Sequence, residues 1–203
     1  MYQLSVVLLS ILSVFWPQAD VPVPERWHTW PVARIFPSVV PGLSPSGARV
    51  TYVLAGVAPE APCRVAFQPA AVRPGCLTAL RATYADSTRT YVATVGIAVL
   101  GAPGTAMYPG TYPGTYPGTY RGTYRGTRPA TVRPVAFPGG PAERFGRRQY
   151  VTGAVAGTGE PYLVATAAGY ADGRAYRPGD RAAPRLRGVA RQLAEALYRA
   201  LTR

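Results

Sequence analysis

Two stretches of the chain combine β-branched and aromatic residues around a turn, a pattern typical of β-hairpins. Residues 77–85 and 90–100 are rich in Thr, Tyr, Val and Ile, and Asp-Ser-Thr-Arg at 86–89 separates them. Residues 149–156 and 162–170 repeat the arrangement across Gly-Thr-Gly-Glu-Pro. The pattern therefore predicts two hairpins of antiparallel strands.

The last 21 residues, APRLRGVARQLAEALYRALTR, predict a helix with one apolar stripe. Pro184 suits the first turn, and Glu195 with Arg199 has the spacing of an i,i+4 ion pair. Such a helix usually covers a sheet, although a basic amphipathic helix can also bind an anionic membrane or a partner groove. The stripe consists of Leu186, Val189, Ala190, Leu193, Leu197, Ala200 and Leu201.

Single strands are predicted at residues 49–57 and 132–137. Together with the hairpins and the helix they predict an α+β domain, an antiparallel sheet covered by the C-terminal helix. The order of parts is similar in the two halves: RVTYVLAGVAPE is echoed by RQYVTGAVAGTGE, and LRATYADSTR by TAAGYADGR. An internal duplication with two similar β-rich halves is a further hypothesis.

The N-terminal residues 1–19 read as a signal-like or short membrane-anchor segment. The run from Leu4 to Trp16 has no charge and would span about 20 Å as a helix, short of the hydrocarbon core of a bilayer. No Lys or Arg precedes it, and Pro17-Gln18-Ala19 is a poor cleavage site, so an uncleaved anchor, a misplaced start and a buried helix stay open. Residues 20–48 are rich in Pro and Trp and are expected to be a linker to a domain at 49–203.

A tetrapeptide repeat, first YPGT and then YRGT, interrupts the domain at residues 101–131. Pro-Gly suits the two central positions of a type II turn, so the repeat predicts a disordered, turn-rich loop. Replication slippage would produce such an insertion without a function. Its tyrosines could adsorb to polysaccharide, and Arg121, Arg125 and Arg128 could contact anionic surfaces.

The charge is strongly basic, with 22 basic against 9 acidic residues and a formal net charge of +13. Every basic side chain other than that of the one His is Arg, and the chain lacks Lys and Asn, which indicates a GC-rich genome. The excess charge still attracts anionic partners such as lipid, envelope polymers or nucleic acid. On the C-terminal helix the candidate contacts are Arg185, Arg187 and Arg191.

Cys63 and Cys76 are the only cysteines, separated by twelve residues. That spacing suits neither a redox C-x-x-C motif nor a usual zinc pairing, and no histidine is close in sequence. Beside a signal-like N-terminus the pair indicates a disulfide and an extracytoplasmic location, with two unrelated buried thiols as the alternative.

Residues suited to catalysis are sparse. The one histidine, His28, lies in the Pro- and Trp-rich stretch, and the sequence has no phosphate-binding, dinucleotide or zinc-protease motif. Asp86 and Asp172 both follow Tyr-Ala, but Asp at the end of a hairpin strand is ordinary turn chemistry. We therefore predict no enzyme, no catalytic residue, no cofactor and no metal site.

The runs CLTALRATYADSTRTYVATVGIAVLG, VRPVAFPGGPAERFG and YLVATAAGYADGR resemble uncharacterised secreted or membrane-anchored proteins of actinomycetes. The resemblance covers about residues 26–200 and implies a domain of unknown function in the cell envelope. Two features depart from it: the tetrapeptide repeat replaces an Ala-rich helical stretch, and the apolar segment lacks preceding charge.

These observations favour an exported or membrane-anchored envelope protein that acts by binding or structure. Its expected partners are the membrane, through the N-terminal segment, and anionic envelope polymers or lipids. The alternative is a cytoplasmic nucleic-acid-binding protein that uses the Arg-rich helix and the YRGT units.

Overall fold

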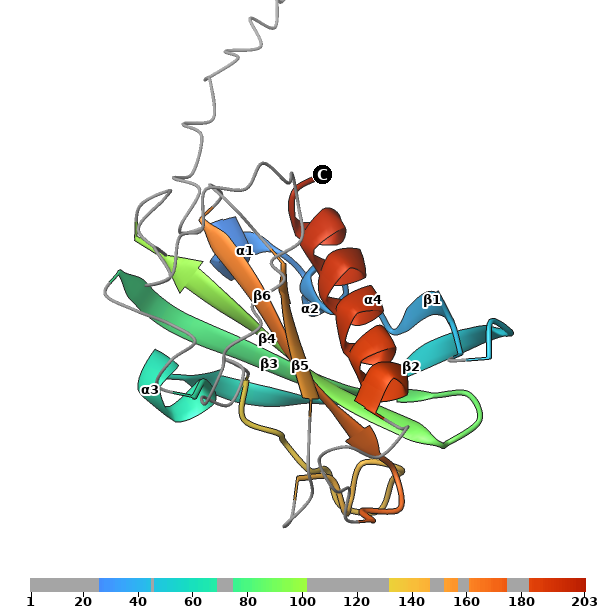
Figure 1. Ribbon diagram of the computed structural model, residues 1–203. Helices are drawn as coiled ribbons and strands as arrows, with labels where there is room; N and C mark the ends of the chain where they lie inside the picture. Colours follow the sequence, from blue (N-terminus) through green and yellow to red (C-terminus); the bar gives the residue numbers. More distant parts are fainter. Residues whose placement is uncertain are drawn as a thin grey trace, which may run out of the picture.

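A six-stranded antiparallel sheet with a long helix across one face forms the domain in the computed structural model (Figure 1). The structure describes residues 26–44, 46–68, 75–101, 132–146, 152–156, 161–174 and 183–203. The strands are β1 (Val39–Leu43), β2 (Arg49–Ala61), β3 (Cys76–Asp86), β4 (Tyr91–Leu100), β5 (Thr152–Ala156) and β6 (Tyr162–Tyr170). The helices are α1 (Arg26–Thr29), α2 (Val32–Ile35), α3 (Cys63–Ala66) and α4 (Ala183–Leu201). The predicted α+β class is confirmed.

Both predicted hairpins are present, and they join into one sheet. The strand order is β1-β2-β3-β4-β6-β5, and all neighbours are antiparallel. The pairing of β4 with β6, for example Val95 opposite Thr166, connects the first hairpin to the second. The two hairpins thus lie side by side in a single sheet, joined where β4 pairs with β6.

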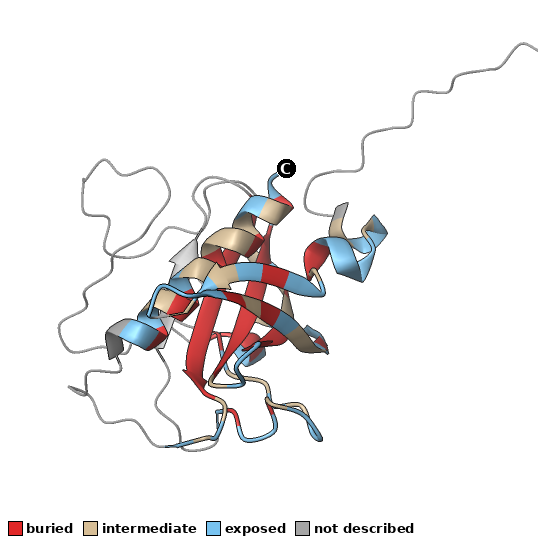
Figure 2. Cartoon of the chain, turned by 90° about the vertical axis from the view of Figure 1, so that its right-hand side faces the viewer, coloured by how far each residue is buried: buried red, intermediate tan, exposed pale blue. Residues whose placement is uncertain are grey.

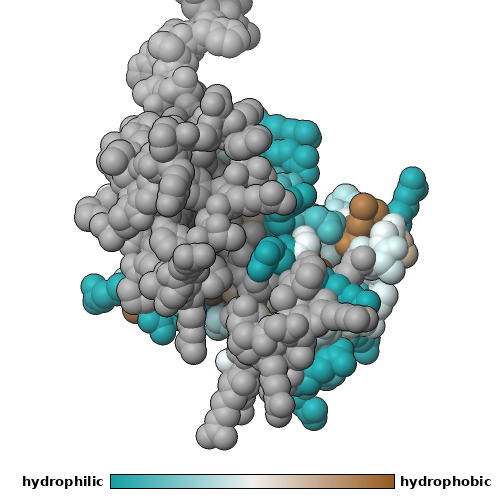
Figure 3. Space-filling model, in the orientation of Figure 1, coloured by the Kyte–Doolittle hydropathy of each residue, from teal (hydrophilic) through white to brown (hydrophobic). Residues whose placement is uncertain are grey.

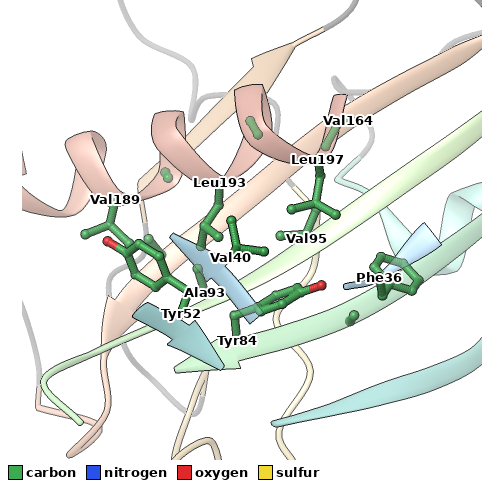
Figure 4. Close-up of a cluster of buried hydrophobic side chains, with 14 of the residues drawn as sticks. Phe36, Val40, Tyr52, Tyr84, Ala93, Val95, Val164, Val189, Leu193 and Leu197 are labelled. Atoms are coloured by element: carbon green, nitrogen blue, oxygen red, sulfur yellow. The ribbon is translucent and has the colours of Figure 1, made fainter. Parts of the chain in front are cut away.

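Helix α4 covers one face of the sheet with its apolar stripe, as the covering interpretation predicts. Leu193 and Leu197 pack above Val95 and Val164 in the main core (Figure 4). The buried residues run along the central strands beneath the helix (Figure 2). Thr166 of β6 also donates a hydrogen bond to the Ala190 carbonyl at 2.9 Å. The apolar side of the helix is therefore buried against the sheet, and only its polar side lies at the surface.

The opposite face of the sheet is covered by α3 and by residues 132–146, and the predicted strand at 132–137 is wrong. Only one β-bridge, between Phe67 and Val132, involves this segment. Further along, Thr83 donates to the Val135 carbonyl at 2.8 Å, and the Val135 N–H donates to the Thr94 hydroxyl at 2.9 Å.

Thr83 and Thr94 also form a hydrogen bond with each other, with 2.8 Å between their hydroxyl oxygens, and both residues are fully buried. Side-chain hydroxyls thus satisfy backbone groups that strand partners would otherwise satisfy. The segment can therefore lie across the sheet as a cover instead of joining its edge.

Glycine allows this cover to approach the sheet closely. A Cβ at Gly96 of β4 would lie 2.5 Å from Cγ2 of Val132 and 3.0 Å from Cε1 of Phe67. Gly56 of β2 lies in the same way beneath the ring of Phe137. Both glycines leave space that the covering side chains fill.

Residues 26–48, expected to belong to a linker, contribute two one-turn helices and the edge strand β1 to the domain. Ile35, Phe36 and Val40 are buried in the main core, and Trp27 and Trp30 pack against it. Pro31 precedes α2, where its fixed φ is compatible with a helix start.

The other regions with specific predictions lie outside the described residues. These are the apolar N-terminal segment and, apart from Gly101, the tetrapeptide repeat. Among the helices that are described, none has both the length and the apolar character needed to span a membrane.

Candidate functional site

A disulfide joins Cys63 to Cys76, as predicted. Cys63 is the first residue of α3 and Cys76 the first residue of β3, and their Cα atoms are 6.3 Å apart, within the usual range for a disulfide. The bond fastens α3 to the sheet. It thereby helps to hold Ala66 and Phe67, which follow in the chain, in the core on the face opposite α4.

The predicted arginines of α4 are all exposed, but two of the three have partners. Arg191 forms an i,i+4 ion pair with Glu195 at 3.3 Å, in place of the expected pair with Arg199. Arg185 lies close enough to the Tyr91 hydroxyl to oppose the rise in the Tyr91 pKa that burial causes. Arg187 has no ion pair with any carboxylate that the structure describes. Arg121, Arg125 and Arg128 of the repeat lie outside the described residues.

Asp86 serves the turn of its own hairpin. One carboxylate oxygen accepts hydrogen bonds from the backbone N–H groups of Thr90 and Tyr91, each at 2.8 Å, and the other accepts one from the Thr88 hydroxyl. The side chain is almost completely buried. This geometry is that of a turn-stabilising aspartate, as the turn interpretation predicts.

Asp172 has a similar local role after β6. Its carboxylate accepts the backbone N–H of Arg174 at 3.0 Å and pairs with the Arg174 guanidinium at 3.4 Å. The same guanidinium stacks 3.8 Å from the ring centre of Tyr170. Asp172 and its partner are exposed, so the pair contributes little to stability.

His28 lies in α1 and stacks on Trp27, with the ring centres 3.6 Å apart. Within the part of the chain that the structure describes, no group of three or more His, Cys, Asp and Glu side chains is placed to hold a metal ion. His28, Asp86 and Asp172 each make local contacts, and none of these contacts joins two of them in a common site.

Hydrophobic side chains reach the surface on the hairpin of β1 and β2. Val39 and Val53 lie directly opposite each other in the two strands, and both are about half exposed. Figure 3 shows brown, hydrophobic groups at the surface on the side where this hairpin lies in Figure 1.

Arg81 and Arg133 form a pair of positive charges that the sequence reasoning missed. Arg81 lies on β3 between Leu80 and Ala82, which face α4, so its side chain enters the opposite face. Its Nε atom is buried and has no hydrogen-bond partner. Burial, and secondarily the charge of Arg133, lower the pKa of Arg81.

Neither arginine of the pair forms an ion pair with a carboxylate that the structure describes. Arg133 donates its backbone N–H to the Ala66 carbonyl at 2.7 Å and its Nε–H to the Phe67 carbonyl at 3.3 Å. A signal was present in the sequence: Arg81 is the one charged residue between Leu77 and Ala85, in a strand that predicts burial on both faces.

Comparison with known proteins adds no relative: no protein-family model, curated protein or solved structure was found to match this chain. The resemblance to actinomycete envelope proteins stays a prediction.

Proposed function

We propose that the protein is exported or membrane-anchored and acts in the cell envelope by binding or by structure, without catalysing a reaction. The disulfide between Cys63 and Cys76 carries this proposal. Disulfides form and persist in oxidising compartments and are rare in the cytoplasm. The signal-like run from Leu4 to Trp16 agrees with the same location.

The surface of the domain supports a role in contacting anionic material. The apolar side of α4 is buried against the sheet. The exposed side of the helix carries three arginines, Arg185, Arg187 and Arg191. Together with the net charge of +13, these side chains suit anionic envelope polymers or lipid headgroups.

Reporter fusions test the location. Alkaline phosphatase, which needs disulfides formed outside the cytoplasm, is fused after Arg203 of the full chain in a bacterial host, and β-galactosidase is fused at the same position in a second strain. We expect an active phosphatase fusion, and we expect deletion of residues 4–16 to abolish that activity. A strongly active β-galactosidase fusion with an inactive phosphatase fusion would contradict export.

A cytoplasmic nucleic-acid-binding role is the second candidate, favoured by the exposed Arg185, Arg187 and Arg191. It predicts retention on single-stranded DNA that falls steeply with salt, and a log–log slope against salt that decreases by about 0.7 for each phosphate-contacting arginine changed to Gln. Arg49→Gln, on the edge hairpin, is the charge-matched control. Weak retention with no dependence on the α4 arginines favours the envelope role.

A further inference from the structure

We propose that Arg81 and Arg133 form a binding site for a doubly charged oxyanion, such as a phosphate group, on the face of the sheet opposite α4. This inference rests on the binding role proposed above in one way: it names the class of ligand that the protein would bind. It does not depend on the compartment in which the protein acts.

The backbone brings the two arginines together. Arg81 pairs across the sheet with Gly96, and Phe67 and Val132 pack directly onto Gly96. Arg133 follows Val132 and is fixed to the backbone of Ala66 and Phe67 by two hydrogen bonds. The backbones of Arg81 and Arg133 therefore both lie next to the place where Phe67 and Val132 pack on the sheet. At this place α3 and the segment that begins at residue 132 approach each other (Figure 1).

Charge and hydrogen bonding then point to an anion. A buried guanidinium donor without an acceptor is costly, and a second positive charge nearby increases the cost. Glu60, on the neighbouring strand β2, accepts a hydrogen bond from Thr78 and forms no ion pair with Arg81. An anion between the guanidinium groups would supply both the acceptor and the opposite charge.

The number of charges favours phosphate over carboxylate. Two guanidinium groups carry two positive charges, and a phosphate monoester carries about −1.5 to −2 at neutral pH. A single carboxylate would neutralise only one of them. Sulfate has the same charge and shape, so it is expected to bind at the same place.

Titration with inorganic phosphate tests the site. Phosphate is added to the full-length, oxidised protein at constant ionic strength set with chloride, and binding is followed by calorimetry and by the thermal midpoint. We expect phosphate and sulfate to raise the midpoint above that in chloride, and acetate to have a smaller effect. Arg81→Gln and Arg133→Gln are each expected to weaken the affinity about tenfold or more, and Arg49→Gln, at the exposed start of β2, to leave it unchanged.

A second variant separates ligand binding from folding. Arg81→Met keeps the apolar stem but removes the buried donor and the like charge, so in chloride its thermal midpoint should be no lower than that of the wild type. Its response to phosphate should be lost. An equal response to phosphate in the wild type, Arg81→Gln and Arg81→Met, or a wild-type midpoint that phosphate does not raise above chloride, would overturn the proposal.

Vesicles distinguish the source of the phosphate group. If the ligand is a lipid headgroup, anionic phospholipid vesicles compete with inorganic phosphate, and Arg81→Gln loses vesicle binding. If vesicles do not compete while the phosphate response still requires Arg81 and Arg133, the site takes a soluble phosphate-containing ligand. Both results support the oxyanion site. They are independent of the reporter fusions, so failure of export and failure of the site can be told apart.

Discussion

The side-chain amide of Gln192 on α4 bonds both backbone groups of Leu43, the last residue of the edge strand β1. Its Oε1 accepts the Leu43 N–H at 2.7 Å, and its Nε2 donates to the Leu43 carbonyl at 3.1 Å, although 149 residues separate the two. An amide that mimics a strand partner therefore ties the sheet edge to the helix. This contact holds the end of β1 against α4. Val40, in the same strand, is buried in the core beneath the helix.

We predict that Gln192→Ala lowers the free energy of unfolding by about 1 kcal/mol, because two hydrogen bonds at a half-buried position are lost. The Leu43 amide should also exchange with solvent faster, which hydrogen exchange measures directly. Arg187→Ala, on the exposed side of the same helix, is the control and should change the stability by no more than about 0.5 kcal/mol. Unchanged exchange at Leu43 in Gln192→Ala would contradict the assigned role.

A pair of glycine substitutions should have opposite effects. At Gly96 an added methyl group would collide with Val132 and Phe67, so Gly96→Ala should destabilise the domain by about 1–3 kcal/mol. At Gly188, within α4, a Cβ would meet no atom within 4 Å, so Gly188→Ala should stabilise it by about 0.5–1 kcal/mol. Chemical denaturation of both variants checks this, and equal effects would show that the cover over Gly96 is loosely packed.

Buried tyrosines should make the domain sensitive to alkali. Burial is the main cause that raises the pKa of Tyr52 from 10.0 to about 12, and burial also raises the pKa of Tyr84. The folded state thus holds these protons more tightly than the unfolded state, so stability is retained below pH 10 and lost as the pH rises from 10 towards 12.

For each such tyrosine the loss is at most about 1.4 kcal/mol per pH unit. Tyr84→Phe, which removes a hydroxyl bonded to the Pro37 carbonyl, should therefore flatten the fall in stability with pH. Tyr198→Phe on α4 serves as the comparison because the Tyr198 side chain is partly exposed, whereas that of Tyr84 is fully buried. Chemical denaturation is measured for both proteins across this pH range. A parallel loss of stability in Tyr84→Phe and the wild type would contradict the prediction.

Hairpins and the covering helix could be predicted because each depends on local information. The β-branched and aromatic residues of β3 and β4, the turn at Asp86 and the apolar stripe of α4 can each be recognised within a short stretch of the chain. The disulfide could be predicted for a similar reason, since the chain offers only one pair of cysteines.

The cover on the opposite face could not be predicted, because it depends on residues distant in sequence. Residues 132–137 have the composition of a strand, but hydroxyl groups of Thr83 and Thr94 satisfy the backbone of Val135 and hold the segment across the sheet. For the same reason the pairing of Arg81 with Arg133 was not foreseen. Their proximity follows from contacts of Phe67 and Val132 that only the folded chain reveals.

The measurement that tests the envelope role most directly is the intact mass of the native protein from fractionated cells, alkylated before and after reduction. We predict a mass two hydrogens below that of the reduced chain. We also predict no alkyl groups before reduction and two afterwards, at Cys63 and Cys76, in the envelope or secreted fraction. Two thiols that react without reduction, in a protein from the cytoplasmic fraction, would contradict the account and favour the nucleic-acid-binding alternative.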